Sequence, residues 1–258
     1  MAKRAYPSTV VSLMVSDVVG DPLDTIASGP TAPDPTTYLD AMNVLKKYGL
    51  WEGSTNSVKE RLVKGCRGMI ADTPKTGDET FRKVFNIVLA NNRLACQAAQ
   101  RALIEAGLKT LYLTSFLEGE AREAGLVLAS IVKEIDASGC PIRRPAALIA
   151  GGETTVTVKG SGKGGRNQEM VLGLFEKIAG MRGIAAASVG TDGVDGSTDA
   201  AGAIVDDRSL SRAARMKLNP TEFLLNNDSY GFFSKMKDLI FTGPTGTNVN
   251  DLFVAVLV

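Results

Sequence analysis

From residue 82 to the end of the chain, apolar runs alternate with helical patterns. The pattern predicts strands at 83–90, 109–115, 146–153, 155–159 and 184–190, and helices at 92–107, 118–139 and 167–180. This alternation indicates a parallel sheet covered by helices.

The last part of the chain is less regular. A short apolar run at 201–207 precedes two predicted helices at 210–218 and 222–236, and two further strands are expected around 239–243 and 252–258. Strands that follow one another without long helices between them favour antiparallel pairing. This part therefore predicts a mixed sheet.

The first 80 residues follow a different pattern. Residues 9–16 (TVVSLMVS) are rich in Val and Leu without regular polar alternation, which predicts a strand covered on both faces. The Pro-, Gly- and Asp-rich segment 17–37 predicts a long ordered loop of the kind that often carries function. Helices are predicted over 36–48 and 55–65, with Ser or Thr caps and glycine stops. A polar linker follows at 66–80.

The change of pattern near Phe81 predicts two domains. We interpret 1–78 as the remnant of an amino-terminal α/β domain with a long functional loop, and 79–258 as a carboxyl-terminal α/β domain. The predicted fold class is α/β, layered α/β/α with parallel to mixed sheets, in a two-domain architecture whose first domain is incomplete.

The composition excludes several classes of protein. A chain of 258 residues with 44% hydrophobic residues can bury a large core, and a net charge of +1 gives no field that would attract nucleic acid. No apolar run approaches the ~20 residues of a membrane span. Histidine is absent, which excludes Ser-His-Asp hydrolases and His-ligated zinc enzymes. Three separated cysteines indicate reduced thiols in a cytoplasmic protein rather than disulfides or zinc.

The segment KGSGKGGRNQEM, residues 159–170, combines glycines with basic residues in front of a predicted helix. It satisfies G-x-G-x-x-G formally, but the helix opens with bulky polar residues, and Walker A fails because no Ser or Thr follows Lys163. Free backbone N–H groups, a helix N-terminus, Lys163 and Arg166 together favour an anion site. The alternative is a loose turn with solvated charges. The predicted phosphate-binding residues of this loop are Gly162, Lys163, Gly164 and Gly165.

Three further polar clusters lie at the ends of predicted elements. In GTDGVDGSTDAAGA, the acids at 192, 195 and 199 suit Mg²⁺ that is shared with substrate phosphates, whereas the spacing does not fit an EF-hand. Turn capping is the alternative role for each acid. The other two clusters are NNDSYGFF, with Asn226, Asn227 and Asp228, and TGPTGTNVND, with Thr245, Thr247, Asn248 and Asp251. Such repeated polarity indicates one polyhydroxylated or phosphorylated ligand.

These clusters, in this order, resemble the class II glycerate kinases, the family with the MOFRL carboxyl-terminal domain. The resemblance spans nearly the whole chain. It is carried by the segments 15–37, 150–169, 190–203, 226–233 and 242–252.

The resemblance implies ATP- and Mg²⁺-dependent phosphorylation of glycerate, on the 2-hydroxyl or the 3-hydroxyl, in carbohydrate metabolism. It places the active site in a cleft between two α/β domains. Arg166 would stabilise the transferring phosphoryl group, and Asp192 would be a catalytic base or, with Asp195, a metal ligand. The implied nucleotide and phosphate contacts add Thr245, Thr247 and Asn248 to the glycine loop, and the implied substrate contacts are Ser28, Gly29, Asn227 and Asp228.

The sequence departs from the family because family members are longer at the amino end. We therefore expect this chain alone to bind ATP or phosphoglycerate weakly and to phosphorylate glycerate slowly, with an amino-terminal domain or a second copy as the candidate protein partner. Two other functions stay open, an NAD(P)H-dependent hydroxypyruvate reductase and a non-catalytic anion-binding fragment. We also expect Arg166, Lys163, Asp192 and Asn248 to approach one cleft.

Overall fold

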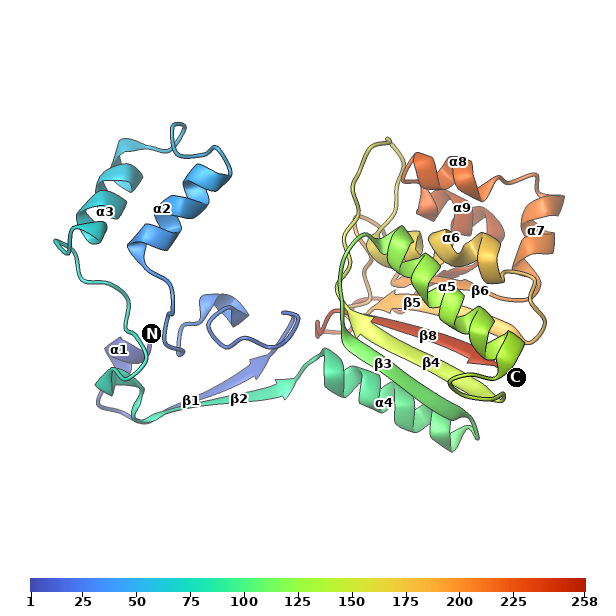
Figure 1. Cartoon of the computed structure of the whole chain (residues 1–258), viewed down its shortest axis with the longest axis horizontal. Coiled ribbons are helices and arrows are strands. Elements are labelled where there is room, and N and C mark those ends of the chain that lie inside the picture. The colour runs from blue at the N-terminus through green and yellow to red at the C-terminus, as the bar shows by residue number, and fades with distance from the viewer. The chain divides into compact units, whose positions relative to one another are not determined.

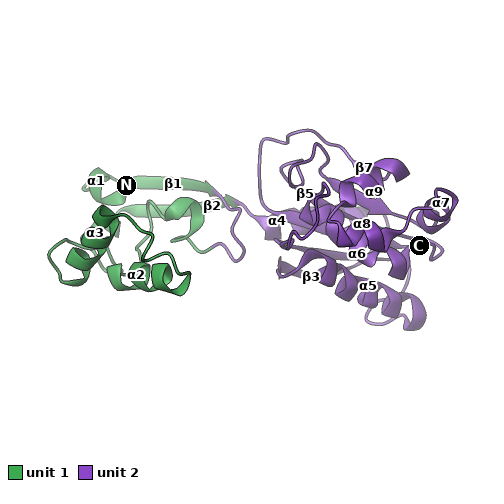
Figure 2. Cartoon of the chain, turned by 90° about the horizontal axis from the view of Figure 1, so that it is seen from above, with its two compact units in different colours: residues 1–14, 22–89 green, residues 15–21, 90–258 purple.

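The computed structural model describes residues 1–258, which form two compact units. The first unit comprises 1–14 and 22–89, and the second comprises 15–21 and 90–258 (Figure 2). The division differs from the predicted boundary at 78/79, because the strand at 84–90 pairs with the strand at 10–15 and belongs mostly to the first unit. Alternation along the sequence does not say which sheet a strand joins.

The first unit contains a two-stranded sheet and short helices. Val10 donates its N–H to the carbonyl of Lys83, which begins the pairing of the two strands. Thr37 and Asp40 form a capping box, so the second helix begins at a predicted cap. The elements are α1 (Ala2–Ala5), β1 (Val10–Val15), η1 (Ile26–Ser28), α2 (Tyr38–Lys47), α3 (Asn56–Cys66), η2 (Glu79–Phe81) and β2 (Val84–Ala90).

The second unit is built on a six-stranded sheet in the order β3-β4-β8-β5-β6-β7. Only β3 and β4 are parallel, and the other neighbours are antiparallel. The strands are β3 (Lys109–Leu117), β4 (Ala146–Gly152), β5 (Ile184–Gly190), β6 (Gly202–Val205), β7 (Leu239–Ile240) and β8 (Asp251–Leu257). The helices are α4 (Asn92–Glu105), α5 (Ala121–Ser138), α6 (Arg166–Ile178), α7 (Ser209–Arg215), α8 (Pro220–Leu225) and α9 (Ser229–Met236).

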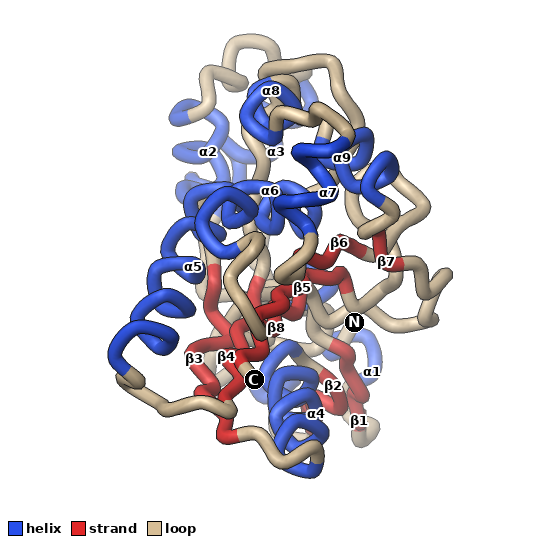
Figure 3. The backbone as a smooth tube through the Cα atoms, turned by 90° about the vertical axis from the view of Figure 1, so that its right-hand side faces the viewer, coloured by secondary structure: helices blue, strands red, loops and turns tan.

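The predicted α/β/α layering is present in this unit. Helices α5 and α6 cover one face of the sheet and α4 covers the other (Figures 1 and 3). Strand β4 is buried along its whole length. The prediction that β1 is covered on both faces was wrong, because its residues alternate between half-buried and exposed positions in a two-stranded sheet. The main core lies between the sheet and α5, α6 and α9. None of the helices has the length and apolar composition needed to cross a membrane.

Two local predictions were wrong. Residues 155–159 form no strand, and only Thr155 makes an isolated bridge, to Glu120. The single helix predicted at 222–236 is interrupted after Leu225, where Asn227 adopts a left-handed φ of 51°. Asp228 then caps α9 by accepting the N–H of Gly231. Side-chain bonds to the backbone therefore outweigh the apolar periodicity here.

Two glycines allow α5 and α6 to approach closely. A Cβ atom on Gly125 would lie 2.3 Å from the carbonyl oxygen of Met170, and one on Gly173 would lie 2.6 Å from that of Arg122. Neither backbone can accept a side chain without moving. The contact fixes α6 against α5 and thereby sets the position of the residues in its first turn.

We predict that Gly125→Ala destabilises the protein by about 1–3 kcal/mol through overpacking. In an exposed helix the same change would stabilise by about 0.5–1 kcal/mol, so the sign of the effect tests the contact. Urea unfolding measures it, with Ser130→Ala on the exposed side of α5 as the control. Unchanged or increased stability of Gly125→Ala would contradict the close approach.

Candidate functional site

A cavity of about 880 Å³ lies in the second unit. The carboxyl ends of β4 and β5 lie opposite the first residue of β8, because both Gly152 and Gly190 pair with Asp251. Glu153 and Thr154 follow β4, and α6 begins beside them with Arg166. The wall comprises Asp17, Val18, Val19, Glu118, Glu153, Thr154, Thr155, Val156, Val158, Gly162, Gly164, Gly165, Arg166, Glu169, Gly196, Ser197 and Asn227.

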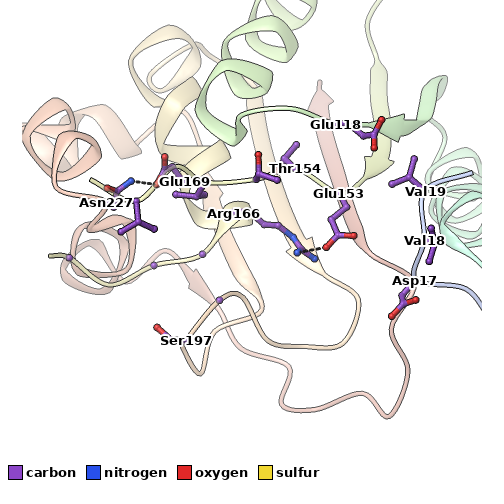
Figure 4. A pocket seen from close by; sticks show the side chains of 17 residues that line it. Asp17, Val18, Val19, Glu118, Glu153, Thr154, Arg166, Glu169, Ser197 and Asn227 are labelled. Carbon is purple, nitrogen blue, oxygen red and sulfur yellow. Dashed lines mark hydrogen bonds and ion pairs between the residues drawn. The ribbon is translucent and has the colours of Figure 1, made fainter. Parts of the chain in front are cut away.

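Figure 4 shows how the labelled side chains are arranged. Asn227 and Glu169 lie at one end of the cavity, and Asp17, Val18 and Val19 lie at the other. Arg166 and Glu153 lie between the two ends and point toward each other. The guanidinium is thus the one cationic group on a wall that otherwise carries four carboxyl groups.

Arg166 is held by two carboxylates. Its Nε lies 2.6 Å from Oδ2 of Asp251, and one terminal nitrogen lies 3.1 Å from Oδ1 of the same residue. The other terminal nitrogen lies 2.6 Å from Oε1 of Glu153. A paired contact of this kind fixes the plane of a guanidinium as well as its position. Arg166 is therefore oriented before any ligand arrives.

Asp251 connects β8 to α6. Its side chain is 6% exposed, and besides Arg166 it accepts the amide Nδ2–H of Asn167 at 2.9 Å. Asn167 in turn accepts the hydroxyl of Ser188 on β5 at 2.6 Å. Burial raises the pKa of Asp251, and the bonds from Arg166 oppose that shift. The network joins the first turn of α6 to two central strands.

Asp195 caps α6 from outside the helix. Its Oδ1 accepts the N–H of Asn167 at 3.0 Å, and its Oδ2 accepts the N–H of Gln168 at 2.8 Å. Burial raises the pKa of Asp195 to about 6, although these backbone bonds favour the ionised form. The protein's own carboxylate thus fills the N-terminus of α6. This differs from the expectation that the helix end is open to a ligand, and from the role of Asp195 as a Mg²⁺ ligand.

The glycine loop is packed against the turn between α8 and α9. The backbone N–H groups from Lys159 to Lys163 donate to oxygens of Asn226, Asn227 and Asp228. A Cβ atom on Gly160 would lie 2.3 Å from the carbonyl oxygen of Asn226. These donors and glycines serve internal packing, so the predicted cradle is mostly closed.

At the end of the glycine loop, two backbone N–H groups are not used in internal packing. The N–H groups of Gly164 and Gly165, both on the cavity wall, donate to no protein acceptor. A Cβ atom on Gly164 would lie 2.2 Å from Oγ of Ser229, and one on Gly165 would lie 2.3 Å from the carboxyl carbon of Asp195. Two amide N–H groups beside Arg166 can therefore donate to an anionic oxygen.

The four residues expected to share a cleft are placed differently. Arg166 lines the cavity, whereas Lys163, Asp192 and Asn248 do not. The Lys163 ammonium lies 4.5 Å from the centre of the Tyr230 ring. Asp192 lies close enough to Asp251 to contribute to the raised pKa of that residue.

The remaining predicted residues fall into three places. Asn227 lines the cavity, and Asp228 bonds the glycine loop and α9. Thr245, Thr247 and Asn248 lie on an exposed loop, and the N–H of Thr245 bonds to the carbonyl of Asp192. Ser28 and Gly29 belong to the first unit, where they line a separate cavity of about 460 Å³.

The acids on the second unit form no group of three that could hold a metal ion. Mg²⁺ that is carried by nucleotide phosphates needs only one or two protein carboxylates. Asp192 is half-buried, and its Oδ1 accepts the N–H of Val194 at 3.0 Å. The single carboxylate of Asp192 therefore fits Mg²⁺ whose other ligands are mainly the phosphate oxygens of a nucleotide.

Sequence reasoning missed several residues of this site. Glu153, Thr154, Glu169 and Glu118 line the cavity. Asp251 was predicted as one member of a polar cluster, but not as the residue that holds Arg166. One signal was available, because Glu153 directly follows the longest all-apolar strand. Glu169 gave no such signal, since its burial depends on the contact with Asn227, whose Nδ2 donates to Oε2 at 3.1 Å. Burial raises the pKa of Glu169.

Two family models match the chain. The MOFRL family matches residues 146–251, and a domain of unknown function (DUF4147) matches residues 1–63. A D-glycerate 2-kinase of Thermotoga maritima is 45% identical over 257 residues, which is all of this chain and 58% of that protein. A glycerate kinase of Macaca fascicularis is 34% identical, over 97% of this chain and 73% of that protein.

The structure agrees with these matches. The crystal structure of a glycerate kinase from Thermotoga maritima superposes with a TM-score of 0.88 at 44% identity. The superposition covers all of this chain and 59% of that one. The chain thus spans a little over half of the length of the first relatives that it matches.

We predict that Asp195 contributes more to the stability of the folded protein at mildly acidic pH than at neutral pH. The folded pKa of about 6 lies above the ordinary value of 3.8, so between these values the folded state binds more protons than the unfolded state. The contribution of Asp195 to the free energy of unfolding therefore grows as pH falls and is lost as pH rises through 6.

Urea unfolding of the wild type and Asp195→Asn tests this sign. The wild type should gain about 1 kcal/mol relative to the variant between about pH 7.5 and about pH 5. A difference that stays constant, or that shrinks at the lower pH, would show that the carboxyl group titrates normally.

Proposed function

The chain belongs to the glycerate kinase family, and we propose that it takes part in the ATP-dependent phosphorylation of glycerate to phosphoglycerate. The observation that carries this proposal is the oriented Arg166 guanidinium in the wall of the cavity, beside the free amides of Gly164 and Gly165. A phosphoryl group gains negative charge on its equatorial oxygens during transfer, and fixed cationic donors stabilise that charge.

The proposed step transfers one phosphoryl group. An oxygen of glycerate forms a bond to the γ-phosphorus, the bond from that phosphorus to the β-phosphate oxygen breaks, and ADP leaves with the electron pair. Arg166 holds the equatorial oxygens in place. The proton of the attacking hydroxyl passes to a carboxylate, and Asp192 stays the predicted base.

The charge of the cavity wall favours ATP that is bound to a cation over free ATP. Asp17, Glu118, Glu153 and Glu169 are acidic, and Arg166 is the one basic residue among them. Such a wall repels a free nucleoside triphosphate and tolerates one that is neutralised by a divalent cation. We therefore propose that ATP enters with Mg²⁺, which supplies charge neutralisation. Coordination of that ion is the alternative role of Asp192 to that of the base.

The remaining ligand contacts of the proposal come from the family resemblance. Asn227 lies on the cavity wall and is suited to a ligand hydroxyl, whereas Asp228, Ser28 and Gly29 stay predicted substrate contacts. Thr245, Thr247 and Asn248 stay predicted nucleotide contacts. A cytoplasmic location also stays a prediction, which three free cysteines support.

The reductase alternative has less support. A dinucleotide fingerprint needs a free helix N-terminus for the pyrophosphate, and Asp195 fills that position in α6. An assay of ADP formation with glycerate, run beside NADH oxidation with hydroxypyruvate, separates the two functions. Turnover only in the second assay would overturn the kinase proposal.

We predict that Arg166→Ala lowers the rate of ADP formation with glycerate by about 10²–10³, as the loss of an oriented transition-state donor does. Arg166→Lys should also lose most of the rate, because it keeps a charge against Asp251 but lacks the planar fork. Lys177→Ala, at an exposed position near the other end of α6, is the control and should keep the wild-type rate. Wild-type turnover by Arg166→Lys would show that bidentate contact is not needed.

A further inference from the structure

The two carboxylates that hold Arg166 differ in their surroundings. Asp251 has a side chain that is 6% exposed, bonds to the arginine at two atoms, and also accepts a bond from Asn167. Glu153 has a side chain that is 39% exposed, lies on the cavity wall and bonds to the arginine through one oxygen. One partner is therefore part of the folded framework and the other faces the cavity.

We infer that Glu153 is an exchangeable counter-anion, which occupies the cavity-facing edge of Arg166 until an anionic oxygen of the ligand takes its place. The inference rests on the anion site proposed at Arg166. A carboxylate and a phosphate oxygen make the same charge-assisted bond to a guanidinium, so each can replace the other. Asp251 already occupies the remaining edge.

Exposure decides which partner is released. An ion pair that is open to water stabilises a protein little, because water compensates each charge when the pair separates. A buried carboxylate that loses its partner is costly, so Asp251 stays in place. Arg166 thus keeps its orientation during the exchange, and only Glu153 has to move.

Glu153 could instead be needed to position Arg166. Its removal would then loosen the guanidinium and weaken anion binding. The exchange role predicts the opposite, because removal of a competing anion leaves the cavity-facing edge of the guanidinium free. The sign of the change in affinity therefore separates the two roles.

The test is calorimetric titration of the purified chain with inorganic phosphate, at constant pH and ionic strength. Glu153→Gln keeps the shape of the side chain and removes its charge, and it should bind phosphate about three- to tenfold more tightly than the wild type. Glu118→Gln removes a charge from the same wall but lies apart from the Arg166–Glu153 pair in Figure 4. Its affinity should change by less than about twofold.

A second variant tests whether the gain passes through the arginine. Adding Arg166→Lys to Glu153→Gln should abolish the gain, because the planar edge that Glu153 vacates is then absent. The inference is overturned if Glu153→Gln binds phosphate as the wild type does or more weakly, if Glu118→Gln gains as much, or if the double variant keeps the gain.

These results are independent of turnover. Tighter phosphate binding by Glu153→Gln in a chain that does not phosphorylate glycerate would support the exchange and contradict the proposed function. Turnover of glycerate together with unchanged phosphate binding by Glu153→Gln would support the function and contradict the exchange.

Discussion

The first turn of α6 is held by two buried carboxylates that come from other parts of the second unit. Asp195 accepts two backbone N–H groups of this turn, and Asp251 binds the side chains of Arg166 and Asn167. Buried charges persist only when they are paired and hydrogen-bonded, so these contacts hold the first turn of α6 in one conformation. The orientation of Arg166, and with it the polarity of the cavity, follows from that constraint. The close contact at Gly125 adds to it by fixing α6 against α5.

The same constraint changes the meaning of the glycine loop. Its sequence suggests a flexible phosphate cradle, but most of its N–H groups bond to the turn at 226–228, and its glycines allow that turn to lie close. A glycine-rich motif before a helix therefore has two physical explanations, a ligand or a neighbouring backbone. Here the neighbouring backbone accounts for Gly160 and Gly162, and only Gly164 and Gly165 combine free amides with the cavity wall.

The sequence predicted the bounds of helices and strands better than it predicted which strands pair with each other. Strands such as β4 and helices such as α5 lie close to their predicted bounds, because apolar periodicity and caps act over a few residues. The pairing of β2 with β1, and the insertion of β8 between β4 and β5, depend on contacts far apart in the chain. The candidate site shows the same limit. Arg166 was predicted from its place between the glycine loop and the helix. Its contact with Asp251 depends on the pairing of β8 with β4, and the contacts of Asp195 depend on the position of its loop beside α6.

The charge balance around Arg166 connects this framework to ligand selection. Two carboxylates compensate the guanidinium of Arg166, so an incoming anion finds no unpaired positive charge. Such a site selects among anions by exchange rather than by long-range attraction. The binding free energy that an anion gains is only the difference between its own bond to Arg166 and the bond that Glu153 gives up. A weak anion gains little from that difference. A multiply charged phosphoryl group gains more, provided that a cation offsets the remaining acids of the wall, and the gain increases as charge develops during transfer. An arginine that is already oriented and already compensated therefore favours the phosphoryl group most strongly at the stage of the reaction at which its charge is greatest.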